Sequence, residues 1–368
     1  MSAGGTAYLG RTGVQLSRLT LGAMNFGVGA PSGTEDATRI VGAALDAGIT
    51  AIDTADVYTQ GASEELIGTA IAHRRDEVFL ATKFHGQIGV DPRNAGNSRR
   101  WIVRAVEDSL RRLGTDRIDL YQAHRPDPHT DILETLQGLD GLVRQGKILY
   151  YGTSVFPPEE LAAAQHLARE HGLIAPVTEQ VPYSALIRGI ERGTLPVARS
   201  YGLGVLTFGP LAAGWLAGGY RRGGPQPSTT REGKIPGRFD VDAPANARKL
   251  DAAGALADLA GVNGLTVVQL AVGFALSHPD VTSVIVGPRT LDHLDSYLAA
   301  AHTVLEPGVL DAIDAITAPG TNYIERDAGI IIPALSPGRL RRSIPATPTP
   351  TPTPTAAPAP LTTPGASS

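Results

Sequence analysis

The chain has 368 residues, with 32 Lys and Arg against 36 Asp and Glu, and a formal net charge of −4. This length permits either two domains or one α/β barrel with insertions. The balanced charge creates no basic field that would attract nucleic acid, so a small neutral or anionic ligand is the better expectation. The chain has no cysteine, which excludes disulfides, thiolate catalysis and cysteine-based metal sites.

No segment of the sequence has the pattern of a secretory signal or a membrane span. The first residues lack an apolar region behind a basic start, and the longest apolar run, at 265–276, is too short to cross a bilayer. We therefore expect a soluble cytoplasmic protein with no membrane partner. The oligomeric state stays open, because the sequence shows no heptad repeat.

Short apolar segments alternate with helical patterns along most of the chain. The first helical pattern, at 34–48, places Ala37, Ile40, Val41, Ala44 and Leu45 on one face before Gly48 ends it. Ser98 is placed to cap a later helix. Eight apolar segments predict strands, at 18–24, 49–53, 78–84, 118–124, 147–154, 175–183, 202–210 and 281–287.

This order predicts one closed (β/α)8 TIM barrel over residues 1–340. An open, doubly wound sheet is disfavoured because no glycine-rich fingerprint follows the first strand. Residues 8–19, with a turn at Thr12 and Gly13, predict a β-hairpin that covers one end of the barrel. Two closing helices are expected at 291–301 and 306–316.

Two segments do not fit the repeating units. Residues 216–239 are rich in Gly and Pro and too long for an ordinary connection, so they are interpreted as a lid or a cofactor clamp. Residues 341–368 alternate Thr or Ala with Pro and have no apolar face, so they predict an extended, disordered tail.

Polar residues end three successive predicted strands. Asp53, Lys83 and His124 end the second, third and fourth strands, and Tyr58 lies five residues beyond Asp53. The carboxyl ends of barrel strands meet at one rim, so these side chains are expected to converge. Taken alone, each residue also has a purely structural interpretation. Asp53 could cap a helix or turn, Lys83 could extend its stem along apolar surface, and His124 could be an ordinary hydrogen-bonded histidine.

Together, the four residues have a chemical logic. A tyrosine with an ordinary pKa near ~10 is a weak acid, and an adjacent ammonium group lowers that pKa. Lys83 could supply this charge, Asp53 would keep Lys83 protonated, and His124 would orient a carbonyl oxygen. Tyr58 would then donate a proton, which requires a separate source of hydride. Asp56 has no part in this set and is interpreted as a loop-capping acid.

Seven motifs resemble, in order and spacing, those of the aldo-keto reductases, over about residues 8 to 317. They are LGAMNFG, IDTADVY, SEELIG, LATKF, SLRRLGTDRIDLYQAHRPDP, GKILYYGTS and VIVGPRT. The likeness is to bacterial members related to the branch that includes potassium-channel β-subunits. It implies a (β/α)8 oxidoreductase that reduces aldehydes or ketones with NADPH (NADP⁺), and it assigns Asp53, Tyr58, Lys83 and His124 to the catalytic tetrad.

The same resemblance implies a set of cofactor contacts. Ser154 and Gln180 match positions that bind the carboxamide, Arg289 matches the position that binds the 2′-phosphate, and Phe208 stands where a ring stacks on nicotinamide. The other implied cofactor positions are Gly22, Met24, Asp53, Gly209, Pro210, Leu211, Gly287 and His293.

Four positions depart from the usual pattern of the family. Val155 replaces a frequent asparagine, Gly209 replaces the usual serine, and His293 and Tyr297 replace a glutamine and an asparagine that commonly contact adenine. The reaction class is therefore better specified than the cofactor preference. Arg289 still favours NADPH over NADH, because its fork of donors suits a phosphate.

Three other functions remain open at this stage. Lys83 could form a Schiff base in a barrel lyase, although a partner acid would keep it protonated. His85, His124 and His129 could bind metal, although their spacing matches no common metal motif. A third possibility is a regulatory or redox-sensing protein that binds NADPH with little turnover.

The resemblance implies a small carbonyl substrate, whose identity the sequence does not specify. Candidate pocket residues are Phe26, Arg125 and Trp215, and the two aromatic residues are equally well interpreted as core.

Overall fold

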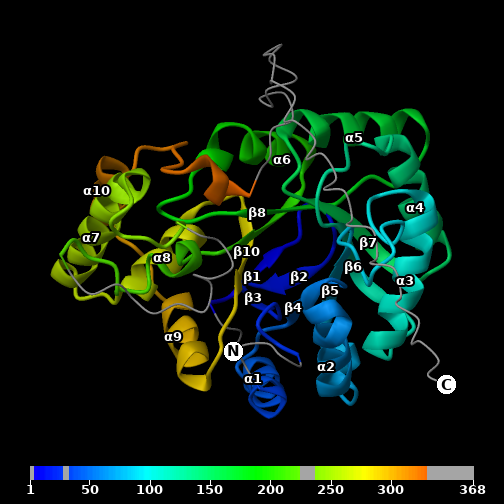
Figure 1. Cartoon of the computed structure of the whole chain (residues 1–368), viewed down its shortest axis with the longest axis horizontal. Coiled ribbons are helices and arrows are strands. Elements are labelled where there is room, and N and C mark those ends of the chain that lie inside the picture. The colour runs from blue at the N-terminus through cyan, green and yellow to red at the C-terminus, as the bar shows by residue number, and fades with distance from the viewer. Residues whose placement is uncertain (1–3, 28–32, 224–236, 330–368) are drawn as a thin grey trace, which may run out of the picture. The chain divides into compact units, whose positions relative to one another are not determined.

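The computed structural model describes residues 4–27, 33–223 and 237–329. Eight parallel strands close into a barrel in the order β10, β3, β4, β5, β6, β7, β8, β9, as predicted (Figure 1). They are β3 (Leu19–Gly22), β4 (Ala51–Asp53), β5 (Phe79–Phe84), β6 (Ile118–Ala123), β7 (Ile148–Ser154), β8 (Thr178–Pro182), β9 (Gly204–Phe208) and β10 (Val281–Val286). The proposed domain boundary at 340 and the tail lie outside the described residues.

Ten α-helices are described, and most lie around the outside of the barrel (Figure 1). They are α1 (Thr34–Asp46), α2 (Ala62–Ile71), α3 (Arg99–Leu113), α4 (Ile132–Arg144), α5 (Pro158–Glu170), α6 (Thr194–Tyr201), α7 (Ala247–Val262), α8 (Val267–Ser277), α9 (Leu291–Ala301) and α10 (Pro307–Ile316). The Ser98 side chain accepts from the Trp101 backbone N–H, as its predicted capping role requires. The sequence patterns did not predict α6 and α7.

The predicted N-terminal hairpin is confirmed by the antiparallel pair β1 (Thr6–Tyr8) and β2 (Gln15–Ser17). Leu9 and Leu16 are fully buried and pack against apolar residues that point into the barrel, namely Ala51, Ala81, Leu120, Leu206 and Ile285. The hairpin therefore closes the end of the barrel at which the strands begin. The half of the barrel interior next to the hairpin is apolar.

The half of the barrel interior at the carboxyl ends of the strands is polar. Side chains alternate along each strand, so every second residue points inward. Two residues beyond the apolar positions Ala51, Ala81 and Leu120 come Asp53, Lys83 and Gln122. A period of two brings each of these polar residues back to the inner face of the barrel. The predicted reactive residues thus occupy one inward layer at the carboxyl ends of the strands.

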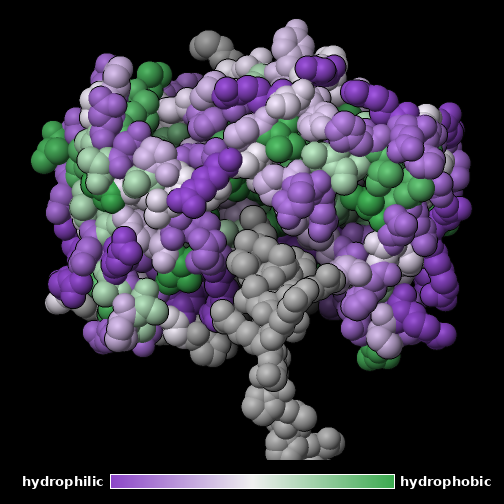
Figure 2. Space-filling model, turned by 90° about the horizontal axis from the view of Figure 1, so that it is seen from above, coloured by the Kyte–Doolittle hydropathy of each residue, from purple (hydrophilic) through white to green (hydrophobic). Residues whose placement is uncertain are grey.

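The described surface is mainly hydrophilic. Figure 2 shows apolar residues in several separate groups among polar ones. The most exposed large apolar side chains, Val90, Val262 and Val304, come from different parts of the chain. Within the described ranges no single helix is long and apolar enough to cross a membrane; the helices at 244–262 and 267–277 meet that test only when joined across a 97° bend.

The predicted lid at 216–239 lies largely outside the described residues. Its flanks are packed: the Trp215 and Tyr220 rings stack with centroids 4.2 Å apart, and Phe239 is buried. Trp215 and Phe26 are both at most 1% exposed and belong to the hydrophobic core cluster, in agreement with their interpretation as core residues.

Candidate active site

A buried ion pair forms the centre of the site. Lys83 Nζ donates to Asp53 Oδ2 at 2.5 Å and to the Thr54 carbonyl oxygen at 2.8 Å. Lys83 is completely buried and Asp53 is 3% exposed. Burial by itself would lower the pKa of Lys83, but the charges and hydrogen bonds of Asp53 and Tyr58 raise it above the ordinary value. Lys83 is therefore a protonated, fixed ammonium group.

This charge state bears on the Schiff-base alternative. An amine that attacks a carbonyl must be neutral, and the pKa of Lys83 is raised. The geometry therefore favours an electrostatic role for Lys83 over a nucleophilic one.

Tyr58 and His124 lie together beside this ion pair. The Tyr58 hydroxyl is 3.5 Å from Lys83 Nζ, and the Tyr58 and His124 rings meet edge to face with centroids 5.8 Å apart. Burial and the nearby Lys83 charge lower the pKa of His124 well below its usual range, so its imidazole is neutral at neutral pH. The four predicted tetrad residues thus meet at one rim.

The pKa of Tyr58 differs from the sequence-based expectation. Lys83 does lower this pKa, but burial raises it by more, and the negative charge of Asp53 also raises it. The net effect is a pKa above the ordinary value. The expectation failed because it considered the ammonium alone and not the desolvation of the phenolate. Tyr58 therefore holds its proton at neutral pH.

Gln180 and Ser154 lie on the neighbouring strands β8 and β7. Gln180 Nε2 donates to Asp53 Oδ1 at 2.8 Å, and Ser154 Oγ donates to the Gln180 carbonyl oxygen at 3.0 Å. Gln180 therefore supports the Asp53 carboxylate, a contact that the sequence did not predict. The hydrogen bond links residues 127 positions apart, and no local pattern encodes such a pairing.

Val155 has a backbone conformation that suits the asparagine implied at this position by the family resemblance. Its φ is +58°, in the left-handed region, where asparagine is tolerated and a β-branched residue is strained. The loop is held by Glu179, which accepts from the Phe156 N–H at 2.9 Å and pairs with the Thr153 hydroxyl. Glu179 is fully buried, and no motif in the sequence indicates its role.

The remaining implied cofactor residues lie at strand ends, on the loops that follow them, or in the first turn of α9. Phe208 ends β9 and is partly exposed, and Gly209 follows it with φ +71°. Arg289 precedes Thr290, the N-cap of α9, and the Arg289 N–H donates to His293 Nδ1 at 3.4 Å. The other members are buried Gly22 and Pro210, partly buried Leu211 and Gly287, and exposed Met24.

Asp56 does not act as the loop cap that the sequence suggested. Its side chain is 1% exposed, and neither carboxylate oxygen has a hydrogen-bond partner among the described residues. The Val57 N–H is near but is not placed for a full hydrogen bond. Burial, together with the charge of Glu64, raises the pKa of Asp56 well above its usual range. Asp56 is therefore a buried carboxyl group whose surroundings favour its protonated form.

The metal alternative required His85, His124 and His129 to converge. His85 Nδ1 hydrogen-bonds Asn97 Oδ1 at 2.9 Å, and His129 is exposed on the next loop. Across the described ranges, no group of three or more His, Asp and Glu side chains has the arrangement of a metal site.

Backbone strain gathers at the rim of the site. Every described non-glycine residue with positive φ lies on a loop that follows a barrel strand: Thr59, Gln60, His85, Val155, Ala212 and Ala213. Such conformations cost about 1 to 3 kcal/mol each and concentrate at functional sites.

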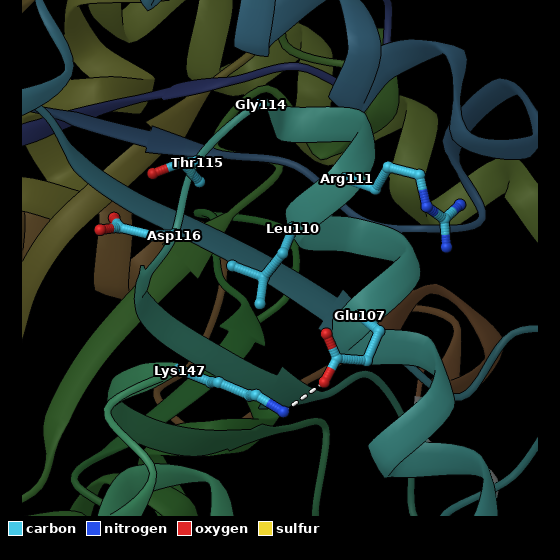
Figure 3. A pocket seen from close by; sticks show the side chains of 7 residues that line it. All are labelled: Glu107, Leu110, Arg111, Gly114, Thr115, Asp116 and Lys147. Carbon is cyan, nitrogen blue, oxygen red and sulfur yellow. Dashed lines mark hydrogen bonds and ion pairs between the residues drawn. The ribbon is translucent and has the colours of Figure 1, made fainter.

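A hollow of about 660 Å³ lies at the opposite end of the barrel (Figure 3). It is lined by the end of α3, the turn before β6 and Lys147, which comes just before β7. Lys147 points toward Glu107 and pairs with it. The hollow is open and lies away from the tetrad.

The closed barrel carries Asp53, Tyr58, Lys83 and His124 together at one rim, which defines a (β/α)8 protein with a polar site at the carboxyl ends of its strands. The Aldo/keto reductase family matches residues 18–318, and the chain belongs to this family of oxidoreductases.

Curated relatives cover almost the same region. An uncharacterized oxidoreductase of Bacillus subtilis, YrpG, is 36% identical over 85% of this chain and 96% of its own length. A probable voltage-gated potassium channel subunit beta of Oryza sativa is 33% identical over 84% and 95%. The L-glyceraldehyde 3-phosphate reductase of Escherichia coli is 32% identical over 81% and 87%.

Proposed function

We propose that this chain reduces a small aldehyde or ketone to an alcohol, with NADPH as the hydride donor and Tyr58 as the general acid. The observation that carries the proposal is the contact of the Tyr58 hydroxyl with the buried Lys83–Asp53 pair, beside neutral His124. A proton donor, a fixed cation and a hydrogen-bonding imidazole at one rim suit carbonyl reduction.

The residues at the rim fit a nicotinamide cofactor. Ser154 and Gln180 place a hydroxyl and an amide side by side on adjacent strands, which complements a carboxamide. Phe208 offers a partly exposed ring on the next strand. Arg289 stands beside the amino terminus of α9, where a guanidinium and backbone N–H groups both favour phosphate.

The chain's own residues account for the proton. NADPH, when bound, supplies the hydride that reduces the carbonyl carbon. Tyr58 donates its proton to the carbonyl oxygen, and His124 orients that oxygen by hydrogen bonding. The Lys83 ammonium stabilises the phenolate left on Tyr58, and Asp53 and Gln180 keep Lys83 in place. Each turnover consumes one proton and forms one alcohol.

Purified protein should consume NADPH when supplied with a reactive aldehyde. The assay follows NADPH absorbance with a set of aldehydes, ketosugars and quinones, and repeats each reaction with NADH. No oxidation of either cofactor with any substrate would refute the proposed function.

The cofactor preference is tested with Arg289→Ala. We expect this variant to weaken NADPH far more than NADH, because only NADPH carries the 2′-phosphate. Equal losses for the two cofactors would remove the phosphate-binding role from Arg289.

The relative named as a probable potassium channel subunit beta supports a second candidate, an NADPH-binding regulatory protein with little turnover. Tight binding of NADPH without sustained consumption would favour this candidate. The complete tetrad favours turnover.

A further inference from the structure

Arg125 lies directly after His124 and has no charged partner among the described residues. Its backbone carbonyl accepts from Asn97 Nδ2 at 2.9 Å, which ties it to the loop after β5. Its guanidinium donates to the His124 carbonyl oxygen at 3.2 Å. No carboxylate in the described ranges lies within ion-pair distance of Arg125, and none of its donors is among the buried polar atoms that lack partners. Its other donors are therefore open to solvent.

The charge of Arg125 acts on the reacting groups. It contributes to lowering the pKa of both Tyr58 and His124, although the net pKa of Tyr58 is raised by burial. The charges of Lys83 and Asp53 compensate each other, and His124 is neutral. These described residues of the site therefore carry one uncompensated positive charge, on Arg125.

The nearby carboxyl groups do not neutralise this charge. Glu179 is close enough for its charge to raise the pKa of Arg125. Burial raises the pKa of Glu179 itself to about 8, so Glu179 is mostly protonated at neutral pH. Asp127 is two residues away, and its oxygens accept from Asn97 N, His129 N and the Thr130 hydroxyl. A partly desolvated guanidinium gains from an anionic partner, and the described part of the chain places none against Arg125.

We propose that Arg125 forms an anion-binding subsite of the substrate pocket, and that the preferred substrates are small aldehydes or ketones bearing a carboxylate or a phosphate. The inference rests on the proposed function, since it places the carbonyl at Tyr58. The substrate's anionic group lies against the guanidinium, whose planar fork of donors matches two oxygens of either group. Arg125 thus selects the substrate and leaves proton transfer to Tyr58.

The test compares matched pairs of substrates with NADPH. Succinic semialdehyde is paired with butanal, and glyceraldehyde 3-phosphate with glyceraldehyde. The variants are Arg125→Gln, Arg125→Lys and the control Arg93→Gln, which removes a positive charge that Asp91 already pairs on the neighbouring loop. For Arg125→Gln, we expect the kcat/KM ratio of charged to uncharged substrate to fall roughly 10- to 100-fold, as for loss of a charge-assisted hydrogen bond.

Arg125→Lys should recover part of this ratio, and Arg93→Gln should leave it unchanged. A fall for one pair alone would still support the subsite and would identify the anion as carboxylate or phosphate. An unchanged ratio in Arg125→Gln, or an equal loss for charged and uncharged substrates, would overturn the subsite and leave Arg125 a support for His124.

A binding measurement separates this inference from the proposed reaction. Succinate and glycerol phosphate are titrated calorimetrically into the protein saturated with NADP⁺. Weaker binding by Arg125→Gln than by wild type supports the subsite even if no aldehyde is reduced. Equal binding by the two proteins overturns it, whether or not reduction occurs.

Discussion

The Tyr58 hydroxyl has a pKa raised by burial and lies 3.5 Å from the Lys83 ammonium. Tyr58→Phe removes the proton donor and keeps the ring against His124. We expect kcat to fall by ~10²- to 10⁴-fold, the usual contribution of general acid catalysis. The affinity for NADPH should change little, because the hydroxyl is assigned to the substrate. Full kcat in this variant would show that Tyr58 is not the acid.

Gly209 illustrates how a single backbone angle limits the residue at a position. Its φ of +71° lies in the left-handed region, although an added Cβ would meet no atom within 4 Å. Gly209→Ala should therefore lower the free energy of unfolding by about 1 to 2 kcal/mol through strain alone.

The matched control is Gly141→Ala, in the last turn of helix α4, where an added Cβ also meets open space. This variant should raise the free energy of unfolding by about 0.5 to 1 kcal/mol, because alanine favours the helix. Urea denaturation of both variants measures the difference. Equal effects would rule out strain at Gly209.

The N-terminal hairpin acts as a plug for the barrel. Leu16 is 1% exposed and packs on the apolar residues inside the strands. Leu16→Ala should lower the free energy of unfolding by about 2 to 4 kcal/mol, as for a large core truncation. Gln15→Ala, at an exposed position of the same strand, should have little effect. A similar loss in both variants would indicate a role for the strand itself rather than for packing.

Elements with a clear pattern were predictable from the sequence, and elements without one were not. The eight strands and the hairpin follow from apolar runs and a turn signal. Helix α7 was missed because its buried face includes a charge, Lys249, which pairs with Asp327 at 2.9 Å. Helix α6 was missed because it has only eight residues and contains Pro196. Such helices depend on contacts that local sequence does not specify.

The positions of the tetrad were predictable, but their electrostatics were not. Motif order and strand ends indicated Asp53, Tyr58, Lys83 and His124. The raised pKa of Tyr58 depends on the degree of burial, and the contact of Gln180 with Asp53 depends on closure of the barrel. Both properties come from residues distant in sequence.

Glu179 should make the stability of the whole molecule depend on pH. Burial raises its pKa from 4.5 to about 8 in the folded state. The folded protein thus keeps the Glu179 proton up to about pH 8, whereas the unfolded chain releases it near pH 4.5. The contribution of this proton to the free energy of unfolding is therefore complete below pH 4.5 and is lost as pH rises through about 8. Between pH 5.5 and 8, the loss should be on the order of 2 to 3 kcal/mol.

The measurement is the free energy of unfolding by urea at pH 5.5 and pH 8. Glu179→Gln keeps the acceptor for Phe156 and cannot ionise, so its decline with pH should be smaller than in wild type. Glu65→Gln, at an exposed position of α2, should follow wild type. Parallel curves for all three proteins would contradict the assigned pKa.

The barrel interior changes from apolar to polar halfway along its strands, and this division has a consequence for mutational tolerance. Leu16→Ala in the apolar layer is expected to alter the free energy of unfolding, whereas a change at Tyr58 is expected to alter the proposed catalysis. Because Leu16 packs in the apolar cluster and Tyr58 contacts Lys83 and His124, a double variant should show nearly additive effects. Substitutions in the rim loops could therefore change the substrate preference while the N-terminal hairpin keeps the barrel closed. The site can evolve without loss of the stability of the barrel.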